Sequence, residues 1–130
     1  MIVLETSALV AALLGEPDRG RILLALTSAE AVIMSAFSRY ETLVVLRGKG
    51  ELDALGAVDL FLSELNATIL SFDEVQSTLA FQAYARFGKG SGSAAKLNLA
   101  DCAAYALATH LSAQLLFVGE DFAHTDVQIA

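Results

Sequence analysis

The sequence alternates short apolar runs of strand length with longer runs in which apolar residues recur at helical spacing. Runs of the first kind are typical of buried strands, and runs of the second kind are typical of amphipathic helices. When strands and helices alternate along a chain, the strands usually pair in parallel and the helices cover the sheet. We therefore predict an α/β fold, with one domain over residues 1–130. Its sheet should be short and mostly parallel, with helices on both faces.

The expected element bounds follow from where these patterns start and stop. Strands are expected at residues 2–5, 32–34, 68–70, 115–118 and 127–129. Helices are expected at residues 7–14, 17–29, 37–47, 51–65, 73–87 and 99–111. Ser7 and Asp73 are expected to cap the helices that they begin, and Pro17 suits the first position of its helix. Residues 88–98 contain three glycines and two serines, so we expect a mobile loop there.

The composition favours a folded chain with one extensive core. Of the 130 residues, 55% are hydrophobic and 18% are charged, which is too apolar for a disordered chain. Some of the apolar surface is expected to form an oligomer or partner interface. No apolar run approaches the ~20 residues that span a bilayer, so we expect no membrane segment.

The cysteine content and the N-terminal residues favour a cytoplasmic protein. Cys102 is the only cysteine, which excludes an intramolecular disulfide. No basic residue precedes Arg19, so a secretory signal is not expected. Both features are typical of proteins of the reducing cytoplasm.

The net charge of −7 argues against a broad nucleic-acid surface, because such surfaces are normally basic. It leaves room for a small metal-dependent site, because a bound cation reverses the local sign of a carboxylate cluster. For a polyanionic substrate the acidic balance is nevertheless unfavourable.

Four acidic residues stand where the surrounding sequence is apolar. Glu5 and Asp121 follow strand-like runs. Glu41 lies within a helical run, and Asp101 opens a nearly all-apolar helix. An isolated buried carboxylate is costly, and few lysine or arginine partners lie near these segments. A divalent cation is therefore the expected partner, and the lack of a histidine or cysteine cluster favours Mg²⁺ or Mn²⁺ over zinc.

The predicted fold gives these four residues a common location. In open α/β sheets, ligands bind at the carboxyl ends of the strands. Glu5 and Asp121 fall at or just after strand ends, and Asp101 lies near a helix N-terminus, where the helix dipole favours a carboxylate. Glu41 joins them if its helix follows the second strand from the same edge.

Each acidic residue also has a plainer interpretation. Glu41 could lie on the solvated face of its helix, and Asp101 could serve only as a capping carboxylate. Asp121 could form a turn, and it competes with Glu120 and Asp126 for a single role.

Several neighbouring residues have two interpretations as well. Ser7 is better explained as a helix cap than as a nucleophile, and Asn98 could cap the following helix or orient Asp101.

Lys89 and Lys96 flank the loop at 88–98, where they could contact phosphate or simply provide solubility. Other residues fit core or dimer contacts: Cys102 as a small core residue, and Phe61, Phe81, Tyr84 and Tyr105 at helical spacing.

Four segments, in this order along the chain, resemble the motifs of the PIN-domain family, and within it the VapC-type toxins of type II toxin–antitoxin pairs. The segments are Ile2-Val3-Leu4-Glu5-Thr6-Ser7-Ala8-Leu9-Val10, Ser38-Arg39-Tyr40-Glu41, Leu97-Asn98-Leu99-Ala100-Asp101-Cys102, and Leu115-Leu116-Phe117-Val118-Gly119-Glu120-Asp121-Phe122 with Thr125-Asp126. Together they cover almost the whole chain, and the ordered set is more specific than any one of them.

This resemblance implies a single PIN-like domain that acts as an endoribonuclease and hydrolyses RNA phosphodiester bonds with Mg²⁺ or Mn²⁺. Glu5, Glu41 and Asp101 would be the core metal ligands, and Asp121 would bind a second ion or act through water. A metal at such a site polarises the phosphoryl oxygen and activates water. The resemblance also implies a homodimer and a cognate antitoxin that covers the site.

The chain departs from the family pattern at three places. Glu5 stands where aspartate is usual, which adds about 1.5 Å of reach near an ion with strict geometry. Ser91-Gly92-Ser93 and Val118 stand where relatives often carry basic residues. These departures motivate an alternative function, a weak or inactive PIN fold that mainly binds an antitoxin. A phosphotransfer or phosphatase domain fits poorly, because Glu5-Thr6-Ser7 lacks the paired aspartates expected after the first strand.

Overall fold

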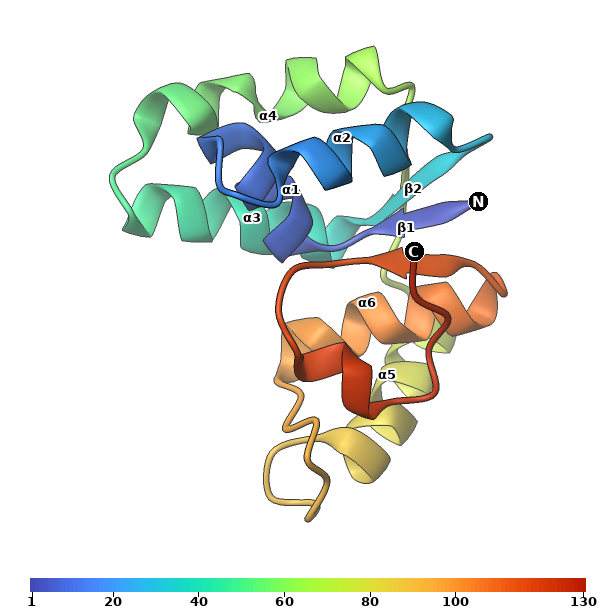
Figure 1. Cartoon of the computed structure of the whole chain (residues 1–130). Helices are drawn as coiled ribbons and strands as arrows, with labels where there is room; N and C mark the ends of the chain where they lie inside the picture. The colour runs from blue at the N-terminus through green and yellow to red at the C-terminus, as the bar shows by residue number, and fades with distance from the viewer.

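The computed structural model describes residues 1–130 and shows a four-stranded sheet with helices on both faces (Figure 1). The elements in chain order are β1 (Ile2–Leu4), α1 (Thr6–Leu14), α2 (Arg19–Ser28), β2 (Val32–Ser35), α3 (Ala36–Gly48), α4 (Leu52–Glu64), β3 (Thr68–Leu70), α5 (Glu74–Phe87), α6 (Leu99–His110), β4 (Gln114–Leu116) and the 3-10 helix η1 (Asp121–His124). None of the helices is long and apolar enough to cross a membrane.

The sheet is entirely parallel, with the strand order β3-β2-β1-β4. β1 is central: Ile2 pairs with Val32 of β2 on one side and with Gln114 of β4 on the other. This arrangement confirms the predicted α/β class and its parallel sheet. Because all four strands run in one direction, their carboxyl ends meet at one edge of the sheet.

The helices bury two apolar layers, one on each face of the sheet. Successive strand residues point to opposite faces, so Val3 joins one layer while Ile2 and Leu4 join the other. α5 and α6 cover the Val3 face, and the other four helices cover the opposite face (Figure 1). α6 is buried along most of its length, as its apolar sequence predicts, and Cys102 is one of its core residues.

Most predicted bounds agree with the structure to within one residue at each end, but three do not. β4 ends at Leu116 and not at Val118. α2 begins at Arg19 and not at Pro17, because Pro17 and Asp18 form a turn ahead of the helix. The strand predicted at 127–129 is wrong. Only Ile129 of that segment pairs, in an isolated bridge to Leu115, so no ladder forms.

The prediction that Ser7 caps α1 is also wrong, and the correction concerns the site. The chain passes from β1 into α1 through a single extended residue, Glu5, which occupies the cap position. Its carboxylate accepts a hydrogen bond from the backbone N–H of Ser7. Asp73 does cap α5 as predicted, accepting a hydrogen bond of 2.9 Å from the backbone N–H of Gln76.

β2 likewise passes directly into α3, with Ser35 as the cap residue. Both α1 and α3 therefore start at the carboxyl edge of the sheet. This satisfies the condition under which Glu41 was expected to join the other acidic residues.

The segment 88–98 is closed at its base by a parallel bridge between Gly88 and Leu97. The backbone N–H of Lys89 donates to the carbonyl of Leu97 at 3.0 Å, and Leu97 is fully buried. The loop is thus anchored at both ends.

Among the aromatic residues expected in a core or dimer contact, Tyr105 is buried, whereas Phe81 is 71% exposed on α5.

Candidate active site

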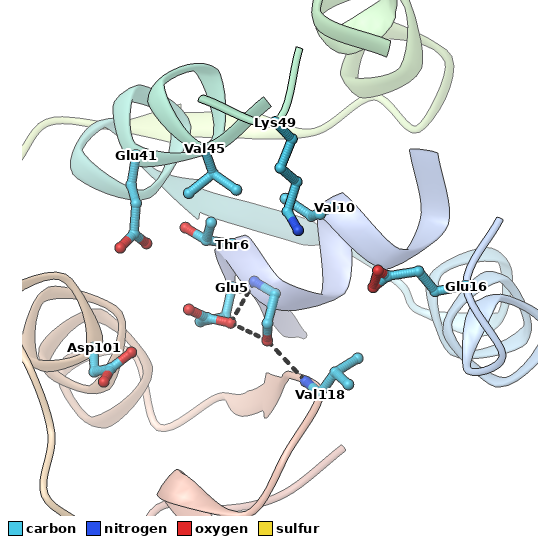
Figure 2. Close-up of a pocket in the computed structure, with 10 residues that line it drawn as sticks. Glu5, Thr6, Val10, Glu16, Glu41, Val45, Lys49, Asp101 and Val118 are labelled. Carbon is cyan, nitrogen blue, oxygen red and sulfur yellow. Dashed lines mark hydrogen bonds between the residues drawn. The ribbon is translucent and has the colours of Figure 1, made fainter. Parts of the chain in front are cut away.

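Three of the four predicted acidic residues line one pocket at the carboxyl edge of the sheet (Figure 2). Glu5, Glu41 and Asp101 come from the end of β1, from α3 and from the first turn of α6. Figure 2 shows their carboxylates directed toward a common space. The cavity has a volume of about 290 Å³, and Val10, Val45 and Val118 form its apolar wall.

Glu5 is the most deeply buried of these carboxylates, at 4% exposed. Its Oε2 accepts a hydrogen bond of 2.7 Å from the backbone N–H of Ser7 and a second, short one from the Ser7 hydroxyl. The Ser7 hydroxyl in turn accepts from the backbone N–H of Val118 at 2.8 Å. Ser7 therefore does not cap the helix. It holds Glu5 in place and ties α1 to the segment that follows β4.

The second oxygen of Glu5 faces the pocket. Oε1 makes no hydrogen bond, yet no buried side-chain oxygen or nitrogen in the chain lacks a partner. Oε1 must therefore be accessible, which agrees with its direction in Figure 2. Burial raises the pKa of Glu5 to about 7; the hydrogen bonds from Ser7 oppose this shift, and the charges of Asp101 and Glu41 add to it.

Asp101, like Glu5, uses one carboxylate oxygen for a hydrogen bond at the start of a helix. It is 9% exposed and forms a capping box with Asn98 at the start of α6. The backbone N–H of Asn98 donates to Oδ2 of Asp101 at 3.0 Å, and the N–H of Asp101 donates to Oδ1 of Asn98 at 2.8 Å. Both interpretations of Asn98 are therefore correct: it caps α6 and it orients Asp101. Asp101 is likewise a helix-capping carboxylate and a pocket residue.

Burial raises the pKa of Asp101, and the hydrogen bond from Asn98 lowers it. Nearby charged residues also shift this pKa, some upward and one downward. The negative charges of Asp121 and Glu41 raise this pKa, and the positive charge of Lys89 lowers it. Asp121 thus lies near Asp101, although it is exposed at the start of η1 and does not line the pocket. Its competitor Asp126 contacts the Tyr105 hydroxyl and Arg86, which gives Asp126 a structural role.

Two charged residues that the sequence interpretation missed also line the pocket, Glu16 and Lys49. Helical spacing offered a signal for Lys49. Glu41, Val45 and Lys49 follow one another at intervals of four residues, so they lie along one face at α3 and its end. Glu16 follows the end of α1, where no comparable pattern pointed to it.

The charge balance of the pocket fits a divalent cation. The three ion pairs of the chain join Arg21 to Asp18, Arg39 to Asp59, and Arg86 to Asp126. None of them neutralises Glu5 or Asp101, although buried carboxylates normally need a partner. The available donors are all oxygens, which hard cations such as Mg²⁺ and Mn²⁺ prefer.

The distances between the carboxylates limit how they could bind a single ion. In the conformation seen, no three side chains of aspartate, glutamate, histidine or cysteine lie close enough to hold one ion. Direct ligation by Glu5, Glu41 and Asp101 therefore requires the carboxylates to move closer together or water to complete the coordination.

The comparisons with known proteins agree with this architecture. The family model of the PIN domain matches residues 2–128. The ribonuclease VapC28 of Mycobacterium tuberculosis is 39% identical over 129 residues, which cover 99% of this chain and 97% of the relative. The ribonuclease VapC42 of the same species is 35% identical over 99% of this chain and 98% of the relative.

Solved structures share the fold at lower sequence identity. The Sarcin-Ricin loop cleaving toxin VapC20 of Mycobacterium tuberculosis superposes with a TM-score of 0.81 and 16% identity, covering 100% of this chain and 98% of the other. A toxin–antitoxin complex from Klebsiella pneumoniae gives a TM-score of 0.76 at 16% identity, covering 100% and 97%. FitAcB from Neisseria gonorrhoeae gives 0.71 at 24% identity, covering 99% and 96%.

Glu5→Gln is expected to stabilise the metal-free protein at about pH 8 and to leave its stability nearly unchanged at about pH 4. The pKa of Glu5 is raised from 4.5 to about 7, so the folded chain binds the proton more tightly than the unfolded chain. This tighter proton binding by Glu5 stabilises the folded chain fully below pH 4.5, and the stabilisation is lost as the pH rises through about 7. The loss amounts to roughly 3 kcal/mol.

Urea unfolding in EDTA at several pH values measures this difference. Glu120→Gln is the control, because Glu120 is exposed, and the change should stay within about 0.5 kcal/mol. A gain in stability for Glu5→Gln of equal size at low and high pH would contradict the argument.

Proposed function

This chain belongs to the PIN domain family, and on that premise we propose that it is a toxin ribonuclease that hydrolyses RNA phosphodiester bonds with Mg²⁺ or Mn²⁺. The observation that carries the proposal is the convergence of Glu5, Glu41 and Asp101 on one pocket without a paired cation. Relatives that are 35–39% identical over nearly their whole length are named VapC ribonucleases, which supports the same activity here.

In this proposal Glu5, Glu41 and Asp101 hold the ion through the oxygens that the fold leaves open. Asp121 acts on a second ion or through water, because it lies outside the pocket but close enough to influence Asp101. When bound, a divalent cation polarises the phosphoryl oxygen, activates the attacking water and offsets charge on the leaving oxygen.

The contribution of the chain is to position these carboxylates. Ser7 restrains one oxygen of Glu5, and Asn98 restrains one oxygen of Asp101. The Thr6 hydroxyl donates to the carbonyl of Ser38 at 3.1 Å, which ties the start of α1 to the helix that carries Glu41. Hydrogen bonds of this kind behind metal ligands orient them and tune their affinity.

We extend the proposal to a homodimer and to an antitoxin partner. A protein of this fold from Klebsiella pneumoniae has been solved as a toxin–antitoxin complex. The chain exposes Tyr40 and Val44 on α3, at 65% and 51%, and exposed apolar side chains on one helix favour a partner surface.

Asp101→Asn is expected to lower RNA cleavage by more than about 100-fold, because it weakens a metal ligand whose outer contacts alone are commonly worth 10–100-fold. Initial rates on a fluorogenic single-stranded RNA in Mn²⁺ measure this loss. The control is Asp53→Asn, an exposed acidic residue in α4 that does not line the pocket. An inactive wild-type protein at every Mg²⁺ and Mn²⁺ concentration would favour the alternative function, an antitoxin-binding module.

Millimolar Mg²⁺ or Mn²⁺ is expected to raise the melting temperature of the wild-type protein and to have a smaller effect on Asp101→Asn. A ligand that binds only the folded state adds about 1.4 kcal/mol of stability at ten times its dissociation constant. Scanning fluorimetry with and without EDTA measures the shift. A wild-type melting temperature that ignores both ions would argue against a metal site while leaving the fold intact.

Glu5→Asp is expected to raise the cleavage rate several-fold. The substitution removes about 1.5 Å of side-chain length near an ion with strict geometry, and aspartate is also a good helix cap. kcat and KM in Mg²⁺ measure the effect, with the melting temperature as a folding control. A lower kcat in a fully folded variant would show that the longer side chain suits this pocket.

A further inference from the structure

The three lysines of the chain all line cavities, whereas most of its arginines serve the fold. Lys49 lines the acidic pocket, and Lys89 and Lys96 line a second hollow. Four of the five arginines are engaged in hydrogen bonds: Arg19 with Ala12, Arg21 with Asp18 and Phe117, Arg39 with Asp59, and Arg86 with Asp126. The lysine ammonium groups form no ion pair and are left available for an external anion.

Lys49 is the only cation in the acidic pocket. Its ammonium group points into the cavity beside Val10, and Asp101 lies on the other side of Glu5 (Figure 2). Lys49 follows Glu41 by eight residues, or about 12 Å along a helix axis. Glu16 points into the same end of the pocket but forms no ion pair with Lys49.

The second hollow lies in the loop between α5 and α6. It has a volume of about 330 Å³ and is lined by Lys89, Gly90, Gly92, Ser93 and Lys96, with no acidic or apolar residue. The bridge between Gly88 and Leu97 closes the loop at its base and holds the hollow next to the start of α6. The loop runs directly into α6, whose first turn carries Asp101, so the hollow lies on the Asp101 side of the pocket.

The two lysine groups therefore stand on opposite sides of the acidic centre. A chain with a net charge of −7 repels RNA at long range, so local cations must hold the strand. Ammonium groups bind phosphate as point charges and require no fixed orientation. We propose that an RNA strand crosses the acidic pocket with one backbone phosphate on Lys49 and another in the Lys89–Lys96 hollow, an inference that rests on the proposed function.

The test is the salt dependence of RNA binding in EDTA, so that no cleavage interferes. The probe is a fluorescein-labelled single-stranded RNA of mixed sequence and about 12 nucleotides, and anisotropy gives Kd between roughly 50 and 200 mM NaCl. The variants are Lys49→Gln, Lys89→Gln and Lys96→Gln. Arg47→Gln is the matched control, because it removes one positive charge near the end of α3 from an exposed residue outside the pocket.

Lys49→Gln is expected to weaken binding about 3- to 10-fold and to reduce the slope of log Kd against log salt by about 0.7, the value for one phosphate contact on a single strand. Lys89 and Lys96 share the second phosphate, so the same loss is expected when Lys89→Gln and Lys96→Gln are combined, and a smaller loss for either one alone. In Mn²⁺ the same variants should raise KM and leave kcat nearly unchanged. Arg47→Gln should leave the salt slope unaltered. Melting temperatures equal to wild type would show that the losses are not caused by unfolding.

Three results would overturn the proposal. If Arg47→Gln weakened binding as much as Lys49→Gln, RNA would be responding to net charge alone. If wild type cleaved RNA and the lysine variants bound it normally, the proposed function would stand and the lysines would serve another partner, such as an antitoxin. A wild-type chain that neither binds nor cleaves RNA would overturn both proposals.

Discussion

The burial of one carboxylate between β1 and α1 is the constraint on which the candidate site depends. Glu5 is the single residue between β1 and α1, and it caps the helix that follows. Its hydrogen bonds from Ser7 extend to Val118, so one side chain joins β1, α1 and the segment after β4. The position of Glu5 at the sheet edge is therefore a consequence of the fold and not of a flexible loop.

Asp101 is positioned in the same way as Glu5, by a hydrogen bond at the start of a helix. Glu5 and Asp101 each commit one oxygen to a helix start, and Figure 2 shows both carboxylates facing the pocket. Burial of these charges costs stability, as the raised pKa values of both groups show. In the proposed function, a cation bound at the pocket would offset that cost, so the cost of burying these carboxylates and the binding of metal would have the same physical origin.

Arginine and lysine residues have different roles in this chain. Arginine can donate several hydrogen bonds in fixed directions, and here it anchors backbone carbonyls and carboxylates, as Arg21 does with Phe117 and Asp18. Lysine carries a mobile point charge, and all three lysines line cavities around the acidic centre. A low overall positive charge is thus compatible with a polyanionic substrate in the proposed binding mode, because the lysines lie along the proposed path of the strand.

The sequence by itself determined the parallel α/β class, the buried helix α6 and the cap at Asp73, because these depend on local periodicity and hydrogen bonding. It also indicated which acidic residues reach the sheet edge, because the ends of parallel strands must meet there. Only the tertiary structure decided that Glu5 and not Ser7 caps α1, that Asp121 lies outside the pocket, and that Lys49 lies within it. These outcomes depend on how each helix is rotated and spaced as it leaves the sheet, and packing between distant segments sets that geometry.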